Sequence, residues 1–274
     1  DLANAEAPVV VGREKLAEAF SGIPNKVDLF RGYAYVATVG IGLQVVDVKT
    51  AKNHTGEADG SAIVGIFDSI GQGYGQPHDI VVYKEGKAIL TTSAGYLILL
   101  DTTIAQVPQH IDAFRPLGYS ATRVGVATEF GYTDAGGTAQ VMDLAVTSGT
   151  LGKINTVDVT DPYAVHVLGT AKDDQGNEVT TIASDIKVSK TTGLAFVTTY
   201  NAIQVFDVKD PFNPRLLNTI AQLPDATGAL VPIGYVPAIA EQNGWVFMAN
   251  QSQGMRVLDL DPSLIEVNPK YIYL

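Results

Sequence analysis

The sequence predicts an all-β protein made of about five copies of one unit, each copy a four-stranded sheet. Three observations lead to this prediction: a recurring apolar hexamer that contains an aspartate, a second apolar run before it, and an Asp-Pro pair after several copies. A fixed period of roughly 20 to 50 residues is typical of solenoids, propellers and other repeat arrays. We therefore expect a β-propeller of about five four-stranded blades, or of six or more if the chain is a fragment.

The hexamer supplies one strand of each unit. Its five aspartates are separated by 54, 57, 49 and 52 residues. The copies are Leu43–Val48, Leu97–Thr102, Ile154–Val159, Ile203–Val208 and Met255–Leu260. Each aspartate is expected to accept a hydrogen bond from a backbone amide two residues further on, which stabilises the turn that follows. In the third copy, Met142–Leu144 offers a competing register.

The other strands of a unit lie on either side of the hexamer. A run such as Tyr33–Ala37 precedes it and is expected to form a hairpin with it. A further run comes before this hairpin, as in Asp79–Val82, and another follows the hexamer, as in Arg215–Ile220. Several of these runs are apolar at successive positions, which predicts sheets that are covered on both faces by neighbouring blades.

The two ends of the chain suggest how the propeller is completed. Val9–Gly12 resembles the end of a repeat, so the chain is expected to start within a blade and to supply the outer strand of the last one, beside Met255–Leu260. Arg13–Phe20 is the best candidate for a short helix. The chain begins without methionine, so we expect that a leader or a preceding region has been removed.

A single domain over residues 1–274 is expected, because propellers of this length form one domain. Residues 103–140 show the least regular pattern and predict an irregular insertion, with Gly131–Gly137 at its tip. Loops on a rigid scaffold often carry binding residues.

The composition excludes several classes of function. The net charge of −11 argues against nucleic acid as a partner, because phosphate binding requires a basic surface. The chain has no cysteine, so it has no thiolate nucleophile, disulfide or cysteine-ligated metal. No run approaches the ~18 apolar residues of a membrane helix. The sequence also lacks the common hydrolase and nucleotide-binding motifs, so no catalytic residue is named.

Four aspartates are the candidates for a metal site. Asp28, Asp79, Asp143 and Asp185 each stand at what we expect to be the start of an inner strand. If they lined the mouth of the channel, their carboxylates could hold a hard cation such as calcium; no other cofactor is expected. The alternative is structural: each carboxylate would accept backbone amides of a neighbouring blade, as a feature of the repeat.

The combination of Ala-Tyr-Val-Ala at 34–37, Leu-Gln-Val-Val-Asp-Val at 43–48 and a later Asp-Pro resembles the LVIVD-repeat family of β-propellers. The resemblance covers residues from about 27 to 262. It implies a secreted or surface-attached prokaryotic protein with no general enzymatic activity.

Three hypotheses about function follow. The first is a non-catalytic, secreted or cell-surface propeller that acts as a binding or assembly module with a protein partner. The second is a metal-dependent hydrolase with its site around Asp28, Asp79 and Asp185. The third is a structural segment of a larger extracellular protein or filament, whose partners are its own flanking regions or copies of itself.

Overall fold

The structure is a computed structural model of the 274-residue chain. It describes residues 9–16, 22–53, 60–84, 86–115, 121–149, 152–224, 227–242, 245–250, 254–259 and 270–272. The chain divides into two compact units, Asp1–Ala113 and Phe114–Leu274, and each is described by itself.

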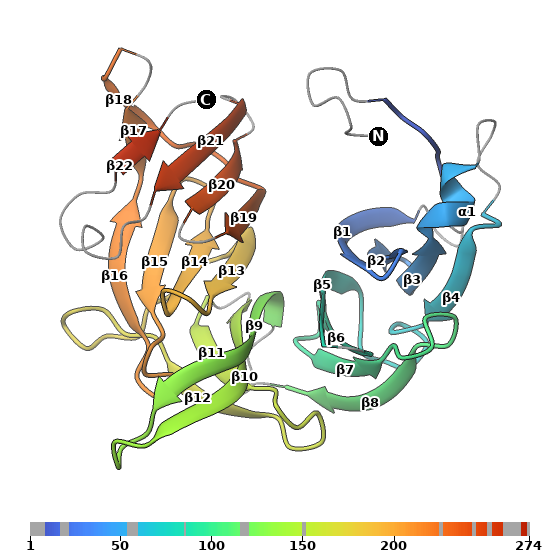
Figure 1. The fold of residues 1–274 in the computed structure, drawn as a ribbon, viewed down its shortest axis with the longest axis horizontal. Helices are drawn as coiled ribbons and strands as arrows, with labels where there is room; N and C mark the ends of the chain where they lie inside the picture. Colours follow the sequence, from blue (N-terminus) through green and yellow to red (C-terminus); the bar gives the residue numbers. More distant parts are fainter. Residues whose placement is uncertain are drawn as a thin grey trace. The chain divides into compact units, whose positions relative to one another are not determined.

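The first unit holds two four-stranded sheets, blades 1 and 2 (Figure 1). Blade 1 consists of β1 (Ile23–Phe30), β2 (Tyr33–Val39), β3 (Gly42–Asp47) and β4 (Ile63–Phe67). Blade 2 consists of β5 (Pro77–Lys84), β6 (Lys87–Thr92), β7 (Leu97–Asp101) and β8 (Gln109–Phe114). The helix α1 (Val48–Lys52) follows β3 directly.

The second unit holds three more four-stranded sheets, blades 3 to 5, and a small hairpin. Blade 3 consists of β9 (Ala121–Thr133), β10 (Ala139–Gly149), β11 (Ile154–Asp158) and β12 (His166–Thr170). Blade 4 consists of β13 (Asp185–Ser189), β14 (Leu194–Thr198), β15 (Ile203–Asp207) and β16 (Arg215–Ile220). Blade 5 consists of β19 (Ala238–Gln242), β20 (Trp245–Asn250), β21 (Gly254–Asp259) and β22 (Lys270–Ile272). The strands β17 (Gln222–Pro224) and β18 (Leu230–Pro232) form the hairpin between blades 4 and 5.

The predicted fold class is confirmed: the described residues form an all-β propeller arrangement of five four-stranded antiparallel blades with almost no helix. In every blade the strands pair in chain order, and the hexamer forms the third strand. The register of the third copy is also settled. Ile154–Asp158 is the third strand of blade 3, whereas Asp143 lies on the second strand, β10.

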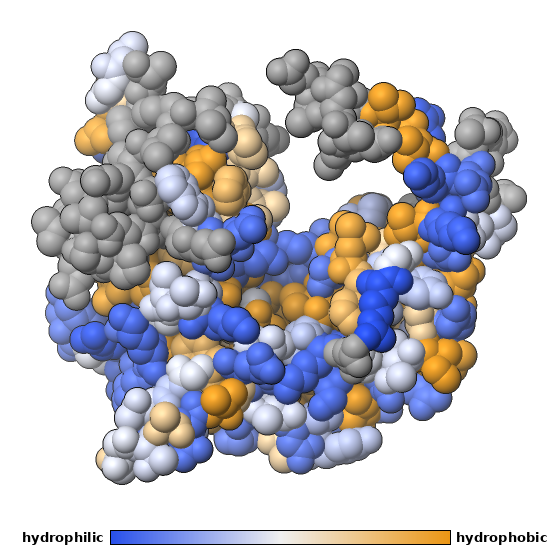
Figure 2. All heavy atoms as spheres, viewed as in Figure 1, coloured by the Kyte–Doolittle hydropathy of each residue, from blue (hydrophilic) through white to orange (hydrophobic). Residues whose placement is uncertain are grey.

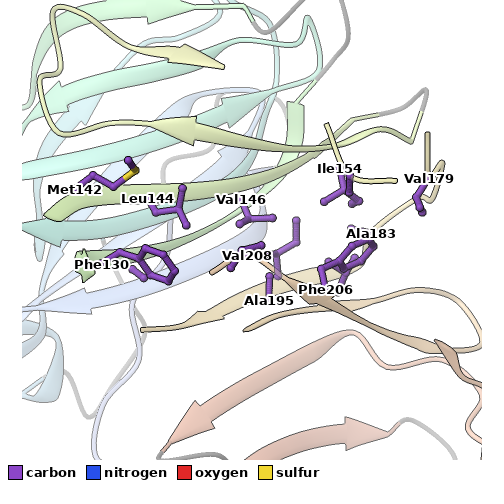
Figure 3. Packing of buried hydrophobic residues seen from close by; sticks show 14 residues of the cluster. Phe130, Met142, Leu144, Val146, Ile154, Val179, Ala183, Ala195, Phe206 and Val208 are labelled. Carbon is purple, nitrogen blue, oxygen red and sulfur yellow. The ribbon is translucent and has the colours of Figure 1, made fainter. Parts of the chain in front are cut away.

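The hydrophobic core of each unit lies between consecutive blades. Side chains alternate between the two faces of a strand, so the first and third hexamer residues point one way and the second and fourth point the other. In the first unit, Leu43 and Val45 of blade 1 share one cluster with Ile98 and Leu100 of blade 2. Figure 3 shows the corresponding layer of the second unit, in which Ile154 of blade 3 and Phe206 of blade 4 belong to one cluster. This packing explains why the strands are apolar at successive positions.

The predicted turn after the hexamer is confirmed in four blades. The carboxylate of each aspartate accepts the backbone amide two residues on, at 2.8–3.0 Å; the four aspartates are Asp47, Asp101, Asp158 and Asp207. The turn after Asp259 lies outside the described residues.

The predicted N-terminal helix does not appear in the described part of its range. Residues 13–16 have no regular structure, and residues 17–20 lie outside the description. Tertiary contacts hold this segment instead. The side chain of Glu14 accepts the amides of Gly60 and Ala62 at 2.7 and 3.1 Å, and Leu16 packs against Val46 and its neighbours.

Two further expectations differ from the structure. The fourth strand of blade 5 is β22, from the C-terminal part of the chain, whereas Val9–Gly12 forms no strand. Much of the region 103–140, expected as an irregular insertion, belongs to β8 and to the long hairpin of β9 and β10. Gly131–Gly137 does include the tip of that hairpin, where Asp134 caps the turn. The sequence pattern was misleading here because these strands are interrupted by Gly, Thr and charged residues.

Candidate functional sites

The four aspartates predicted to bind metal do not occupy equivalent places. Asp28 and Asp79 belong to the inner strands of blades 1 and 2, and Asp185 opens the inner strand of blade 4. Asp28 stands near the end of its strand rather than at its start. Asp143 lies on β10, which is not an inner strand.

Two of these carboxylates join consecutive blades. One oxygen of Asp28 accepts the amide of Val82 on β5 at 2.7 Å, and one oxygen of Asp185 accepts the amide of Ile239 on β19 at 2.9 Å. In each case donor and acceptor are 54 residues apart, about one repeat. The second oxygen accepts the amide of the next residue in the same strand. These contacts favour the structural interpretation, because backbone amides already occupy both oxygens.

The other two aspartates also contact the backbone. Asp79 is fully buried and accepts the amide of Ile80 at 2.9 Å. Asp143 accepts the amide of Glu129 at 3.1 Å, beside an irregularity in the pairing of β9 with β10. Glu129 has a positive φ of 53°, a conformation that few non-glycine residues adopt. Asp143 therefore stabilises an unusual turn of the backbone within its own blade.

In blade 3 an arginine also bonds the backbone of the next blade. Arg123 on β9 and Asp185 on β13 hold the same register position. They stand opposite Ser148 and Thr198, the second-strand residues that pair with the first hexamer residue of their blades. The guanidinium of Arg123 donates to the carbonyl of Ser184 in blade 4 at 2.7 Å. Charged side chains of either sign on an inner strand thus bond the backbone of the next blade. The carboxylate of Asp185 accepts from an amide, and the guanidinium of Arg123 donates to a carbonyl.

No group of three or more histidine or acidic side chains is placed to hold a metal ion within the described residues. The acidic loop between Lys172 and Glu178 likewise forms a tight turn. Asp173 accepts the amides of Gln175 and Asn177 at 3.0 and 2.8 Å. Hydrogen bonds from the Asn177 side chain, and then from its backbone amide, lower the pKa of Asp173.

The second unit has an apolar hollow on one face of blade 5. It has a volume of about 790 Å³ and lies over β19, β20 and β21. Orange, hydrophobic spheres cover part of β20 and β21 in Figure 2. We call this surface the blade 5 face; its lining residues are Tyr235, Pro237, Ala238, Ile239, Ala240, Phe247, Met248, Ala249, Asn250, Gly254 and Met255.

The repeat explains why this face is unusual. Met255 is the first hexamer residue of blade 5 and is 57% exposed, whereas the equivalent Leu43 and Ile203 are fully buried. Phe247 pairs with the third hexamer residue and is partly exposed, whereas its equivalent in blade 4, Phe196, is fully buried. In blades 1 and 4 the next blade covers these positions. The blade 5 face is thus an interior type of surface that the other described residues of its own unit leave open.

The chemistry of the blade 5 face suits apolar contacts. None of its lining residues carries a charge. At its edge the ring of Tyr235 lies 5.8 Å from the ring of Tyr200, which is 78% exposed. Tyrosine, phenylalanine and methionine are enriched in protein interfaces, and large exposed apolar patches mark interaction sites.

Sequence reasoning did not identify the blade 5 face. Met255 and Phe247 were recognised only as parts of strands, because an apolar strand looks the same whether or not another sheet covers it. The one available signal was positional: these residues belong to the last recognisable copy of the repeat.

Comparisons with known proteins support the fold and leave the function open. No protein-family model and no curated protein matches the sequence, so membership of the LVIVD-repeat family stays a prediction. Among solved structures, the chain is similar to a functionally unknown protein from Desulfotomaculum acetoxidans. The TM-score is 0.57 at 12% identity, and the match covers 86% of this chain and 68% of that chain. A similarity at this identity concerns the fold alone. Among the residues that the structure describes, no helix has the length and apolar character of a membrane span.

Proposed function

We propose that this chain is a non-catalytic binding module of a secreted or cell-surface protein, and that it binds a protein partner through the blade 5 face. The observation that carries the proposal is the open, uncharged surface around Phe247, Ala249 and Met255. The acidic composition and the resemblance to LVIVD-repeat propellers support the extracellular location.

Leaving such an apolar surface in contact with water costs free energy. Burying a large apolar side chain such as Met255 or Phe247 contributes about 1.5–3 kcal/mol. A partner would gain this contribution without removing a charged group from water, because the face has none. The backbone beneath the face is a paired antiparallel sheet, so little ordering is required on binding.

The inner-strand carboxylates give less support to a hydrolase. Catalysis by a metal needs ligand oxygens that point into an open coordination site. Asp28 and Asp185 instead direct both oxygens to backbone amides. Binding through a rigid sheet therefore accounts for more of the structure than metal chemistry does.

Because the chain has no cysteine, a crosslinker can be attached at one introduced cysteine, which allows a direct test. A photo-crosslinker attached to Met255→Cys should join the module to a defined partner from the extracellular fraction of the source cells, whereas one attached to Tyr163→Cys should not. Tyr163 is a matched control, because it is 75% exposed and lies on the turn before β12, away from the blade 5 face. The purified partner should then bind wild type saturably and bind Ala249→Glu at least tenfold more weakly. Equal crosslinking from both cysteines, or unchanged affinity of Ala249→Glu, would refute the proposal.

A further inference from the structure

We infer that the first unit holds a binding site for a small organic carboxylate, in a hollow between blades 1 and 2. The hollow has a volume of about 200 Å³ and is lined by residues of this unit. We call it the hydroxyl pocket; its polar lining residues are Arg31, Tyr33, Tyr35, Thr102, Thr103 and Gln106. The blade 5 face belongs to the other unit, so this site goes beyond the proposed function.

The hydroxyl pocket lies where the repeat departs from its own pattern. On the second strand of blade 1, Tyr35 pairs with the third hexamer residue and Tyr33 with the fifth. Thr102 is the sixth hexamer residue of blade 2. The equivalent residues at the junction of blades 3 and 4 are all aliphatic: Val146, Leu144 and Val208. Three hydroxyl-bearing side chains thus replace three aliphatic ones at one junction.

The packing of the two junctions shows what this replacement changes. Leu144, Val146 and Val208 are fully buried and belong to one apolar cluster, in the layer that Figure 3 shows. Aliphatic side chains at these positions are therefore compatible with a closed junction between blades. In the first unit the same positions line a hollow. Buried hydroxyls and unfilled space both lower stability, so folding alone does not account for these residues.

The hydroxyl of Thr102 is unsatisfied. The residue is 3% exposed, and its Oγ1 has no partner in ordinary hydrogen-bonding geometry among the described residues. Burial raises the pKa of Tyr35, and the nearby Thr102 hydroxyl partly offsets this by lowering it. The Tyr35 phenol therefore keeps its proton at neutral pH and can act as a donor. A ligand oxygen beside the two hydroxyls would supply the missing hydrogen bonds.

The donors of the hydroxyl pocket favour an anionic group. None of its lining residues carries a carboxylate, and Arg31 is the one charged residue among them. Gln106 Nε2 donates to the Tyr33 hydroxyl at 3.1 Å, which leaves the hydrogen of that hydroxyl for a further acceptor. The planar guanidinium of an arginine matches the two oxygens of a carboxylate. A carboxylate thus fits this set of donors better than a neutral group does.

The rest of the lining favours a small apolar body on that carboxylate. The Arg31 guanidinium carbon lies 5.4 Å from the centre of the Phe30 ring, and both Phe30 and the buried Ala105 line the hydroxyl pocket. Pockets for drug-sized ligands measure about 300–1,000 Å³, so a volume of about 200 Å³ suits a smaller molecule. One guanidinium balances the single charge of a carboxylate but not the double charge of a phosphate.

Two matched pairs of probes test the site on the full chain. In saturation-transfer NMR and calorimetry, benzoate and isobutyrate should bind saturably. Benzamide and isobutyramide have the same shapes without the charge and should bind at least tenfold more weakly. Inorganic phosphate should not displace benzoate. Failure of both carboxylates to bind, equal binding of acids and amides, or displacement by phosphate would overturn the inference.

Three variants locate the binding in the hydroxyl pocket. Thr102→Val restores an aliphatic residue of the repeat, so it should keep the stability of wild type in urea and weaken benzoate binding at least tenfold. Tyr35→Phe should weaken binding to a similar extent. Arg31→Asn removes the charge and should abolish the preference for benzoate over benzamide; asparagine tolerates the positive φ of 49° at this position.

Tyr163→Phe is the control, because it removes a hydroxyl from a 75% exposed tyrosine of the second unit and should bind benzoate as wild type does. Circular dichroism would verify the fold of each variant. Thr102→Val changes little in shape, so it keeps the test decisive if Tyr35→Phe does not fold. Unchanged benzoate affinity in Thr102→Val, or an unchanged preference in Arg31→Asn, would overturn the site. Crosslinking from Met255→Cys reports on the proposed function separately.

Discussion

Asp185 offers the clearest test of how the blades are held together. Its carboxylate is 1% exposed and accepts the amide of Ile239 in the next blade, which is also buried. Replacing Asp185 with alanine leaves that amide without its acceptor in a place that water does not reach. An unsatisfied buried donor costs about 1–3 kcal/mol. Since the bond is also charge-assisted, we expect Asp185→Ala to lower the free energy of unfolding by about 2–3 kcal/mol.

Asp28 provides an internal comparison. It makes the same kind of contact with the amide of Val82, but in a partly exposed position. Water can replace part of the lost bond there, so Asp28→Ala should cost only about 0.5–1 kcal/mol. The difference between the two variants measures the contribution of burial, because the hydrogen-bonding groups are the same.

The assay is equilibrium unfolding in urea, followed by circular dichroism because Asp28 and Asp185 lie in different units. The fluorescence of Trp245, the single tryptophan, on β20 of blade 5, follows the second unit in addition. Changes in the midpoint report stability where the slope is unchanged. Hydrogen exchange of the peptide that contains Ile239 should show lost protection in Asp185→Ala. Asp174→Ala, at an exposed loop position, is the control and should match wild type. Two results would refute the reasoning: a loss of unfolding free energy below about 0.5 kcal/mol for Asp185→Ala, or a loss for Asp28→Ala that exceeds the loss for Asp185→Ala.

Three further predictions concern other positions. Gly169→Ala should destabilise the protein by about 1–3 kcal/mol, because a Cβ there would lie 2.5 Å from the carbonyl oxygen of Phe212 in the next blade. Gln44→Met should raise stability by about 1 kcal/mol, because the buried Gln44 amide has no hydrogen-bond partner among the described residues. Asp101→Asn should lower stability at neutral pH, and its difference from wild type should shrink as the pH falls through the lowered pKa of Asp101, because hydrogen bonds from the hydroxyl and amide of Thr103 lower that pKa. That carboxylate contributes stability above its unfolded pKa, and the contribution is lost as the pH falls through its folded pKa.

Urea unfolding measures all three, and each has an outcome that contradicts it. Gly131→Ala is the control for Gly169→Ala, since a Cβ at Gly131 meets nothing within 4 Å; equal effects would contradict the steric argument. A destabilised Gln44→Met would show that the amide makes contacts that matter to folding. For Asp101→Asn, a difference from wild type that does not shrink as the pH falls through the lowered pKa would exclude the effect of ionisation.

The fold could be predicted from the sequence because its main determinants are local and repeated. The alternation of side chains along a strand, the turn aspartates such as Asp47 and the apolar character of both faces all appear in each copy. Every copy repeats the same pattern. An ambiguous register prediction in one blade, such as the alternative at Met142–Leu144, can therefore be resolved by comparison with the other copies. The turns could be predicted for the same reason. The hydrogen bond from the Lys49 amide to the Asp47 carboxylate joins residues that are only two positions apart.

Contacts between distant segments could not be predicted in the same way. The expected helix at Arg13–Phe20 was a local inference, whereas Glu14 bonds the backbone of residues 60 and 62. The candidate metal residues were grouped because each was expected to start an inner strand. The structure instead places Asp143 on a second strand and directs Asp28 and Asp185 to backbone amides of the next blade.

The sequence by itself therefore determined the hexamer strands, the blade repeat and the turns, since these depend on residues close together in the chain. Only the tertiary structure decided which apolar faces are covered. Leu43 and Met255 hold the same position in the repeat and are both apolar. One is buried and the other is 57% exposed, because burial depends on whether a second sheet packs against the strand, and that is a property of the assembled blades.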